Sequence, residues 1–134
     1  MAIRVVADTH TILWYLYNDA RLSSTASALM DTIDKAGDQI AIASITLAEI
    51  IYLVEKGRID SLAFGRVVQS IKQFNATLVE VPFDHTIAEA MRQIARVQVP
   101  ELPDRIVTAT ALHLGVPVIS RDHIGVSYVC LFAH

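Results

Sequence analysis

Cysteine is nearly absent from this chain, since Cys130 is the single cysteine among 134 residues. One thiol excludes an internal disulfide and any cysteine-based metal site. Long apolar runs are also missing: stretches such as ITLAEIIYLVEKG meet charge well before the roughly 18 residues that a membrane span needs. The beginning, MAIRVVADTH, meets charge too soon for a signal peptide. We therefore expect a cytoplasmic protein with no membrane partner.

A surplus of positive charge is missing as well. The formal net charge is −3 and the isoelectric point is near 5.9, which argues against a generic basic nucleic-acid binder. It does not argue against a nuclease. Four carboxylates bound to metal would leave a remainder that is about neutral or slightly positive, and the bound cation would itself attract phosphate.

Apolar residues, in contrast, are abundant, at 53% of the chain with a mean hydropathy of +0.43. Strands of a parallel sheet that is covered on both faces have this composition, because they are near-continuous Val, Ile and Leu runs. The length suits one domain with a real core, and the chain has no repeat, linker or low-complexity segment. We expect a single domain over residues 1–134.

Strand-like and helix-like segments alternate along the chain. The predicted strands are Ile3–Ala7, Gln39–Ala43, Thr77–Val81, Val116–Ser120 and Ser127–Phe132. The predicted helices are Thr11–Tyr17, Ser24–Ala36, Thr46–Lys56, Ser61–Phe74, His85–Val97 and Asp104–Leu114. Gly37, Gly57 and Gly115 stand where helices should end. This order predicts an α/β fold, a three-layer α/β/α sandwich around a mostly parallel sheet of four to five strands.

Four acidic residues occupy positions of one kind in this pattern. Asp8 follows the strand IRVVA, Glu49 lies in the first turns of the helix after QIAIAS, Asp104 opens the helix DRIVTATALHL, and Asp122 follows VPVIS. Open parallel sheets bind ligands outside the carboxyl ends of their strands. Carboxylates gathered there would repel one another unless a hard divalent cation held them. The pattern points to metal-dependent chemistry on phosphate.

Each acid, taken alone, also has a structural explanation. Asp8 and Asp104 suit helix N-caps, and Asp122 suits a turn. Thr46 and Glu49 form a T-x-x-E capping box. The functional interpretation depends on all four acids together. In this topology the helix N-termini and the carboxyl ends of the strands lie at the same edge of the sheet, so the four side chains are predicted to lie near one another.

Hydroxyl side chains are predicted at the same edge, at Ser44, Thr46 and Ser120. Two arginines, Arg105 and Arg121, follow or precede acids of the set. They suit contacts to the phosphates of a nucleic acid, and equally suit surface ion pairs with Asp104 and Asp122.

Together, the segments VVADTHTILWYL, ASITLAEIIYLVEKGRI and LPDRIVTATALHLGVPVISRD resemble the PIN domain, and most closely the VapC-type toxins of toxin–antitoxin pairs. The resemblance runs from the start to about Asp122, and the tail DHIGVSYVCLFAH departs from it. It implies that Asp8, Glu49, Asp104 and Asp122 hold Mg²⁺ or Mn²⁺ for RNA hydrolysis. Ser44, Thr46 and Ser120 match positions that often carry supporting hydroxyls.

The resemblance also implies roles and partners. Asp8 would be the central ligand beside Asp104 and Asp122, and Glu49 would bind a second ion or orient the attacking water. Hydrolysis would leave a 5′-phosphate and a 3′-hydroxyl. The implied partners are RNA, a small antitoxin whose tail covers the acidic pocket, and a second copy of the chain in a homodimer.

Other classes fit less well. A haloacid-dehalogenase-type phosphatase would carry a second Asp at His10, and a receiver domain would want acids at Val5 and Val6. A PIN-like domain that only binds RNA or protein stays open. The aromatic residues Trp14, Tyr15, Tyr17 and Tyr52 could stack on bases, but their helical spacing favours core or interface positions.

Overall fold

The structure, a computed structural model, describes residues 1–99, 101–121 and 127–130, and of 121 and 127–130 only the backbone. Its strands are β1 (Ile3–Ala7), β2 (Gln39–Ala43), β3 (Leu78–Val81), β4 (Val118–Arg121) and β5 (Ser127–Cys130). Its helices are α1 (Thr9–Leu16), α2 (Ser24–Lys35), α3 (Ile45–Glu55), α4 (Ala63–Lys72), α5 (His85–Met91) and α6 (Leu102–Leu114).

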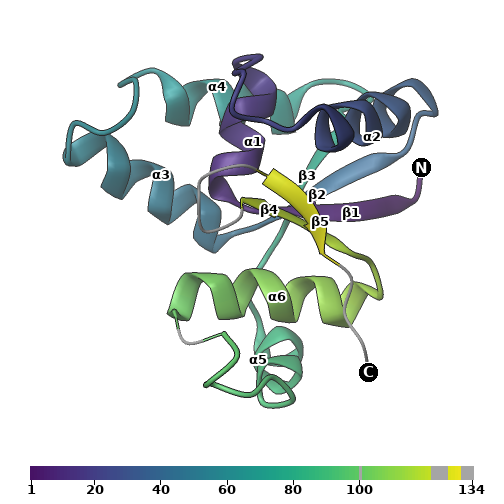
Figure 1. Cartoon of the computed structure of the whole chain (residues 1–134), viewed down its shortest axis with the longest axis vertical. Coiled ribbons are helices and arrows are strands. Elements are labelled where there is room, and N and C mark those ends of the chain that lie inside the picture. The colour runs from purple at the N-terminus through teal and green to yellow at the C-terminus, as the bar shows by residue number, and fades with distance from the viewer. Residues whose placement is uncertain (100, 122–126, 131–134) are drawn as a thin grey trace.

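The strands form one sheet in the order β3-β2-β1-β4-β5 (Figure 1). Neighbouring pairs from β3 to β4 are parallel, and β5 runs antiparallel to β4. The predicted fold class, with its mostly parallel sheet, is therefore confirmed. The predicted fifth strand is present over Ser127–Cys130, and its last two predicted residues lie outside the described residues.

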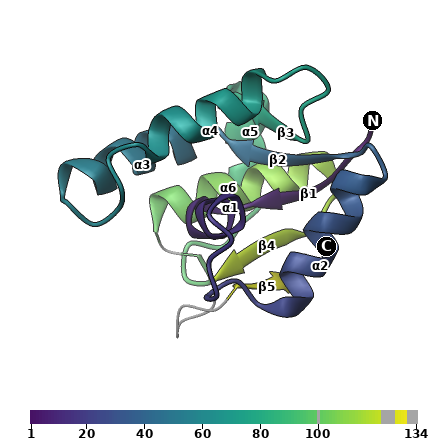
Figure 2. The same cartoon turned by 90° about the horizontal axis from the view of Figure 1, so that it is seen from above.

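Helices cover both faces of the sheet, with α1 to α4 on one side and α5 and α6 on the other (Figures 1 and 2). Alternate side chains of β1 and β2 pack on opposite faces of the sheet. Val5 and Ile42 pack with the cluster under α1, α2 and α4. Val6 and Ala41 pack with Ile106 and other residues of α6. This two-sided burial explains the continuous apolar strands in the sequence.

Several predicted boundaries were wrong, for identifiable reasons. Helix α5 ends at Met91 instead of Val97, because the N–H groups of the next three residues bond to carbonyls three residues back and tighten the chain into turns. Helix α6 begins two residues early, at Leu102, because Pro103 is tolerated in a first helical turn. Strand β4 begins at Val118, since Pro117 has no N–H for the ladder.

The predicted helix stops at glycine are confirmed. Gly37, Gly57 and Gly115 adopt φ values of +76°, +68° and +70°, a region that L side chains rarely enter. Within the described ranges, no helix is both long and apolar enough to cross a membrane.

Candidate active site at the carboxyl edge of the sheet

The carboxyl ends of β1, β2 and β4 lie at one edge of the sheet, and the first turns of α1, α3 and α6 lie beside them (Figures 1 and 2). Three of the four predicted acids are on these described elements. The fourth, Asp122, lies outside the described residues.

Asp8 joins β1 to α1. Its side chain caps the helix by accepting a hydrogen bond of 2.9 Å from the Thr11 backbone N–H. Its own backbone N–H donates to the Ile119 carbonyl at 3.1 Å, which ties the residue to β4. The capping explanation of Asp8 is therefore confirmed, and the same bonds hold its carboxyl group at the junction of the two central strands.

Glu49 is connected to this junction through Thr9. The Thr9 hydroxyl donates a hydrogen bond of 2.5 Å to Glu49 Oε1, and the Thr46 hydroxyl lies 3.3 Å from the same Thr9 oxygen. Both threonines are buried. Side chains after β1 and after β2 thus meet in one hydrogen-bonded cluster at the edge.

The capping-box explanation of Glu49 is wrong. Helix α3 has Ser44 as its N-cap, and Thr46 is its second residue rather than the cap that the motif requires. The residue that sequence reasoning missed is Thr9. Its position directly after Asp8 was the one signal in the sequence, since the burial of its hydroxyl, which calls for a partner, is a property of the folded chain.

The predicted supporting hydroxyls have different surroundings. Thr46 belongs to the cluster with Thr9. Ser44 Oγ instead accepts a hydrogen bond of 3.0 Å from the Phe83 backbone N–H and so fixes the loop after β3. Ser120 is half-buried in β4, in register with Tyr128. Their catalytic support stays a prediction.

Asp104 is exposed in the first turn of α6, three residues after the N-cap Glu101. Among the residues that the structure describes, no group of three or more acidic, histidine or cysteine side chains is placed to hold a metal ion. The donor chemistry nevertheless suits Mg²⁺ or Mn²⁺, because carboxylates are the oxygen ligands that such ions prefer. Metal binding by the four acids stays a prediction.

The Arg105 side chain contacts the end of α5. Its Nη2 donates a hydrogen bond of 3.2 Å to the Met91 carbonyl at the end of α5. Its Nη1 is buried, with no hydrogen-bond partner among the described residues. These contacts join α5 to α6, whereas an RNA contact by Arg105 stays untested. Arg121 ends β4, and its side chain is outside the described part.

A cleft of about 760 Å³ adjoins Glu49 between α1, α3 and α4. Its aromatic lining is Trp14, Tyr17 and Tyr52, and its charged lining is Asp19, Arg21, Glu49, Arg58, Asp60 and Glu101, with His10 at the Trp14 ring. We call it the α1–α3–α4 cleft. It extends the candidate active site away from the sheet edge.

The aromatic residues of this cleft differ in exposure. Trp14 is buried, as its spacing predicted, and the Arg21 guanidinium lies 5.2 Å from its ring centroid. Tyr52 is 56% exposed, so of its two predicted positions, core or interface, the core is excluded. Burial and the neighbouring Asp60 carboxylate raise the pKa of Tyr17, whose hydroxyl lies 3.2 Å from Asp60 Oδ2. Tyr17 therefore acts as a hydrogen-bond donor in the wall.

The family model of the PIN domain matches residues 5–125. The chain belongs to the PIN domain family. One similar solved structure is described as VapBC2 from Rickettsia felis bound to a DNA fragment from their promoter. The identity is 14%, the TM-score is 0.65, and the match covers 90% of this chain and 89% of that chain. No curated protein matches the chain.

Membership of the PIN domain family supports a nuclease. The match of this PIN domain spans all four predicted acids, Asp8, Glu49, Asp104 and Asp122. The likeness to the Rickettsia structure concerns the fold, because the identity is low.

Proposed function

We propose that this PIN domain is a metal-dependent endoribonuclease, the toxin of a toxin–antitoxin pair. The observation that carries the proposal is the cluster at the carboxyl edge of the sheet. There Asp8 sits between β1 and β4, and Glu49 is hydrogen-bonded to the next residue of the chain, Thr9. On a PIN domain, such a pairing of carboxylates suits a site for phosphate hydrolysis.

Asp8, Asp104 and Asp122 would hold the ion, with Glu49 as a further ligand or as the group that orients the attacking water. A bound Mg²⁺ or Mn²⁺ would polarise the scissile phosphate and lower the pKa of a bound water. The chain supplies positioning. The α1 cap fixes Asp8, the Thr9 hydroxyl fixes one oxygen of Glu49, and the N-terminal end of α6 favours a phosphate beside Asp104.

Attack in line with the leaving oxygen would break the bond between phosphorus and the 3′-oxygen. The products would then carry a 5′-phosphate and a 3′-hydroxyl. The Thr9 bond holds the Glu49 carboxylate as an acceptor, which suits it to take a hydrogen bond from the attacking water.

The proposed partners follow from the same family. One similar solved structure is of VapBC2 from Rickettsia felis, which supports a partner antitoxin for this chain. The antitoxin tail would cover the acidic site, and two copies of the chain would form a homodimer. An acidic edge suits a tail that carries basic side chains.

The test is an RNA cleavage assay with wild type and Asp104→Asn, each with Mg²⁺, with Mn²⁺ and with EDTA. Asp104 is exposed, so the substitution should leave the fold intact. We expect metal-dependent cleavage by wild type, products that a 5′-phosphate-dependent exonuclease degrades, and loss of activity in the variant. Equal cleavage by both proteins would refute this assignment. RNA binding without cleavage in wild type would indicate a binding module.

A further inference from the structure

Helix α3 carries side chains from the candidate active site along the α1–α3–α4 cleft. Glu49 and Tyr52 are three residues apart and both line the cleft, as neighbours on one helical face do. Arg58 lines the same cleft just beyond the end of the helix. An acid of the site, an exposed aromatic ring and a cation thus follow one another along one wall.

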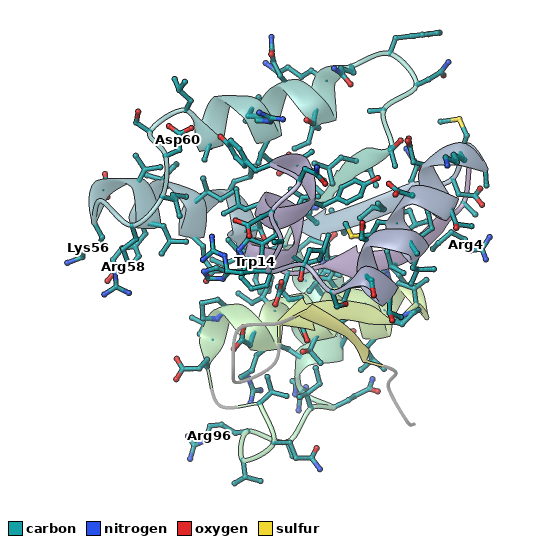
Figure 3. All side chains as sticks on the ribbon, turned by 45° about the horizontal axis from the view of Figure 1, so that its top comes forward. Arg4, Trp14, Lys56, Arg58, Asp60 and Arg96 are labelled. Atoms are coloured by element: carbon teal, nitrogen blue, oxygen red, sulfur yellow. The ribbon has the colours of Figure 1, made fainter. Side chains whose placement is uncertain are left out.

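The backbone at Arg58 is fixed by the end of α3. The Gly57 N–H donates to the Val54 carbonyl at 2.9 Å, and the Arg58 N–H donates to the Leu53 carbonyl at 2.9 Å. With Gly57 at φ +68°, this is a Schellman motif. The guanidinium therefore extends from a rigid turn, on the side of the molecule where Lys56 also projects (Figure 3).

Two other charged groups of the cleft, the Arg21–Asp19 pair and Asp60, already have partners. Arg21 pairs with Asp19 through contacts of 2.8 and 3.1 Å, and Asp60 accepts hydrogen bonds from the Tyr17 hydroxyl and the Leu62 N–H. Arg58, in contrast, makes no ion pair within 4 Å in the part of the chain that the structure describes. Its positive charge is available to a ligand.

We propose that Arg58 and Tyr52 form a subsite for the part of the RNA beside the cleaved bond. Arg58 binds a phosphate of that RNA, and Tyr52 stacks on one of its bases. The inference rests on the proposed ribonuclease function. A guanidinium suits a phosphate because it can make two parallel hydrogen bonds, and an exposed tyrosine suits base stacking irrespective of sequence. Lys56, whose Nζ lies 5.6 Å from the Tyr52 ring centroid, adds positive charge to the same end.

The test measures binding of short fluorescein-labelled single-stranded RNAs to proteins that also carry Asp104→Asn, so that the RNA stays intact. The variants are Arg58→Ala, Arg58→Lys, Tyr52→Leu and Tyr52→Phe. The matched control is Arg96→Ala, which removes an exposed arginine from the segment after α5, remote from Arg58 (Figure 3).

We expect Arg58→Ala to weaken binding about tenfold and to lower the slope of log K against log salt by about 0.7, the value for one lost phosphate contact on a single strand. Arg58→Lys should keep the slope. Tyr52→Leu should weaken binding about fivefold or more, and Tyr52→Phe should restore it, because the ring is kept.

Equal salt slopes for Arg58→Ala and Arg96→Ala would overturn the subsite and leave an antitoxin segment as the alternative occupant of the cleft. If the protein without any substitution neither binds nor cleaves RNA, the proposed function itself fails. Thermal melts of each variant separate these results from misfolding, and the conservative Arg58→Lys and Tyr52→Phe retain the native shape.

Discussion

Replacing Thr9 by valine tests the hydrogen bond that joins the two sides of the candidate site. Valine keeps the branched shape of the side chain and removes its hydroxyl. Thr9 is 3% exposed, so water cannot easily replace the lost donor. Its bond to Glu49 Oε1 is 2.5 Å long, at the lower end of the usual range for a hydroxyl donating to a carboxylate.

A hydrogen bond to a charged group contributes about 1.5–3 kcal/mol, against about 0.5–1.5 kcal/mol for a neutral one. We therefore expect Thr9→Val to lower the free energy of unfolding by about 1.5–3 kcal/mol. The matched control is Thr110→Val, which removes a buried hydroxyl that donates to the neutral Ile106 carbonyl at 2.7 Å. Thr110→Val should lower the free energy of unfolding by less than Thr9→Val does.

The assay is urea denaturation at pH 7, followed by circular dichroism, with the slope m unchanged in both variants. A double-mutant cycle with Glu49→Gln isolates the pair, because Thr9→Val should cost much less once the charged acceptor is gone. The reasoning is refuted if Thr9→Val costs no more than Thr110→Val. It is also refuted if the cost is the same with and without the Glu49 substitution.

Three further predictions concern neighbouring groups. Asp8→Asn should keep the unfolding free energy within about 0.5 kcal/mol, because Asn also caps helices, while Asp8→Ala should lower it by about 1 kcal/mol in urea denaturation. Both variants should lose RNA cleavage, and retained cleavage by Asp8→Asn would contradict the site. Arg105→Met should change stability by less than about 1 kcal/mol, because the lost bond is offset by removal of a buried unpaired donor, and a larger loss in the same assay would show that the α5–α6 contact matters more. The hydrogen bond from Arg21 lowers the pKa of Asp19 from 3.8 to about 2, so the pair stabilises the fold above pH 3.8 and this contribution is lost as the pH falls through 2. The small stability difference between wild type and Arg21→Ala should therefore shrink over this range to the part that comes from the Arg21–Trp14 contact, and a difference that does not change with pH would exclude the pair as a cause.

The fold could be predicted because local signals agreed with the global pattern. Two-sided apolar strands such as β1 and β2 identified a covered parallel sheet, and Gly57 and Gly115 ended their helices as expected. Helix boundaries were predicted less accurately next to proline, because a proline can either precede a helix or lie in its first turn. Pro103 was taken to precede α6 but lies in its first turn, a position that the sequence leaves open.

The candidate site was only partly predictable, because sequence places residues on elements but does not show which side chains meet. The edge position of Asp8 and Glu49 followed from topology. The bond between Thr9 and Glu49 joins residues forty positions apart, so no local pattern reveals it. Arg58 likewise follows a helix end, and its lack of an ion-pair partner in the described ranges is a property of the folded surface.

The most direct test of the central claim, that the acids at the sheet edge hold a catalytic cation, is an Mn²⁺ titration of the purified protein followed by electron paramagnetic resonance. Wild type should bind the ion, and Asp8→Asn and Asp104→Asn should each weaken binding at least about tenfold, or about 1.4 kcal/mol. Asp38→Asn, which removes a carboxylate just before β2 at the opposite edge of the sheet, should bind like wild type. Equal Mn²⁺ binding by all four proteins would contradict the account.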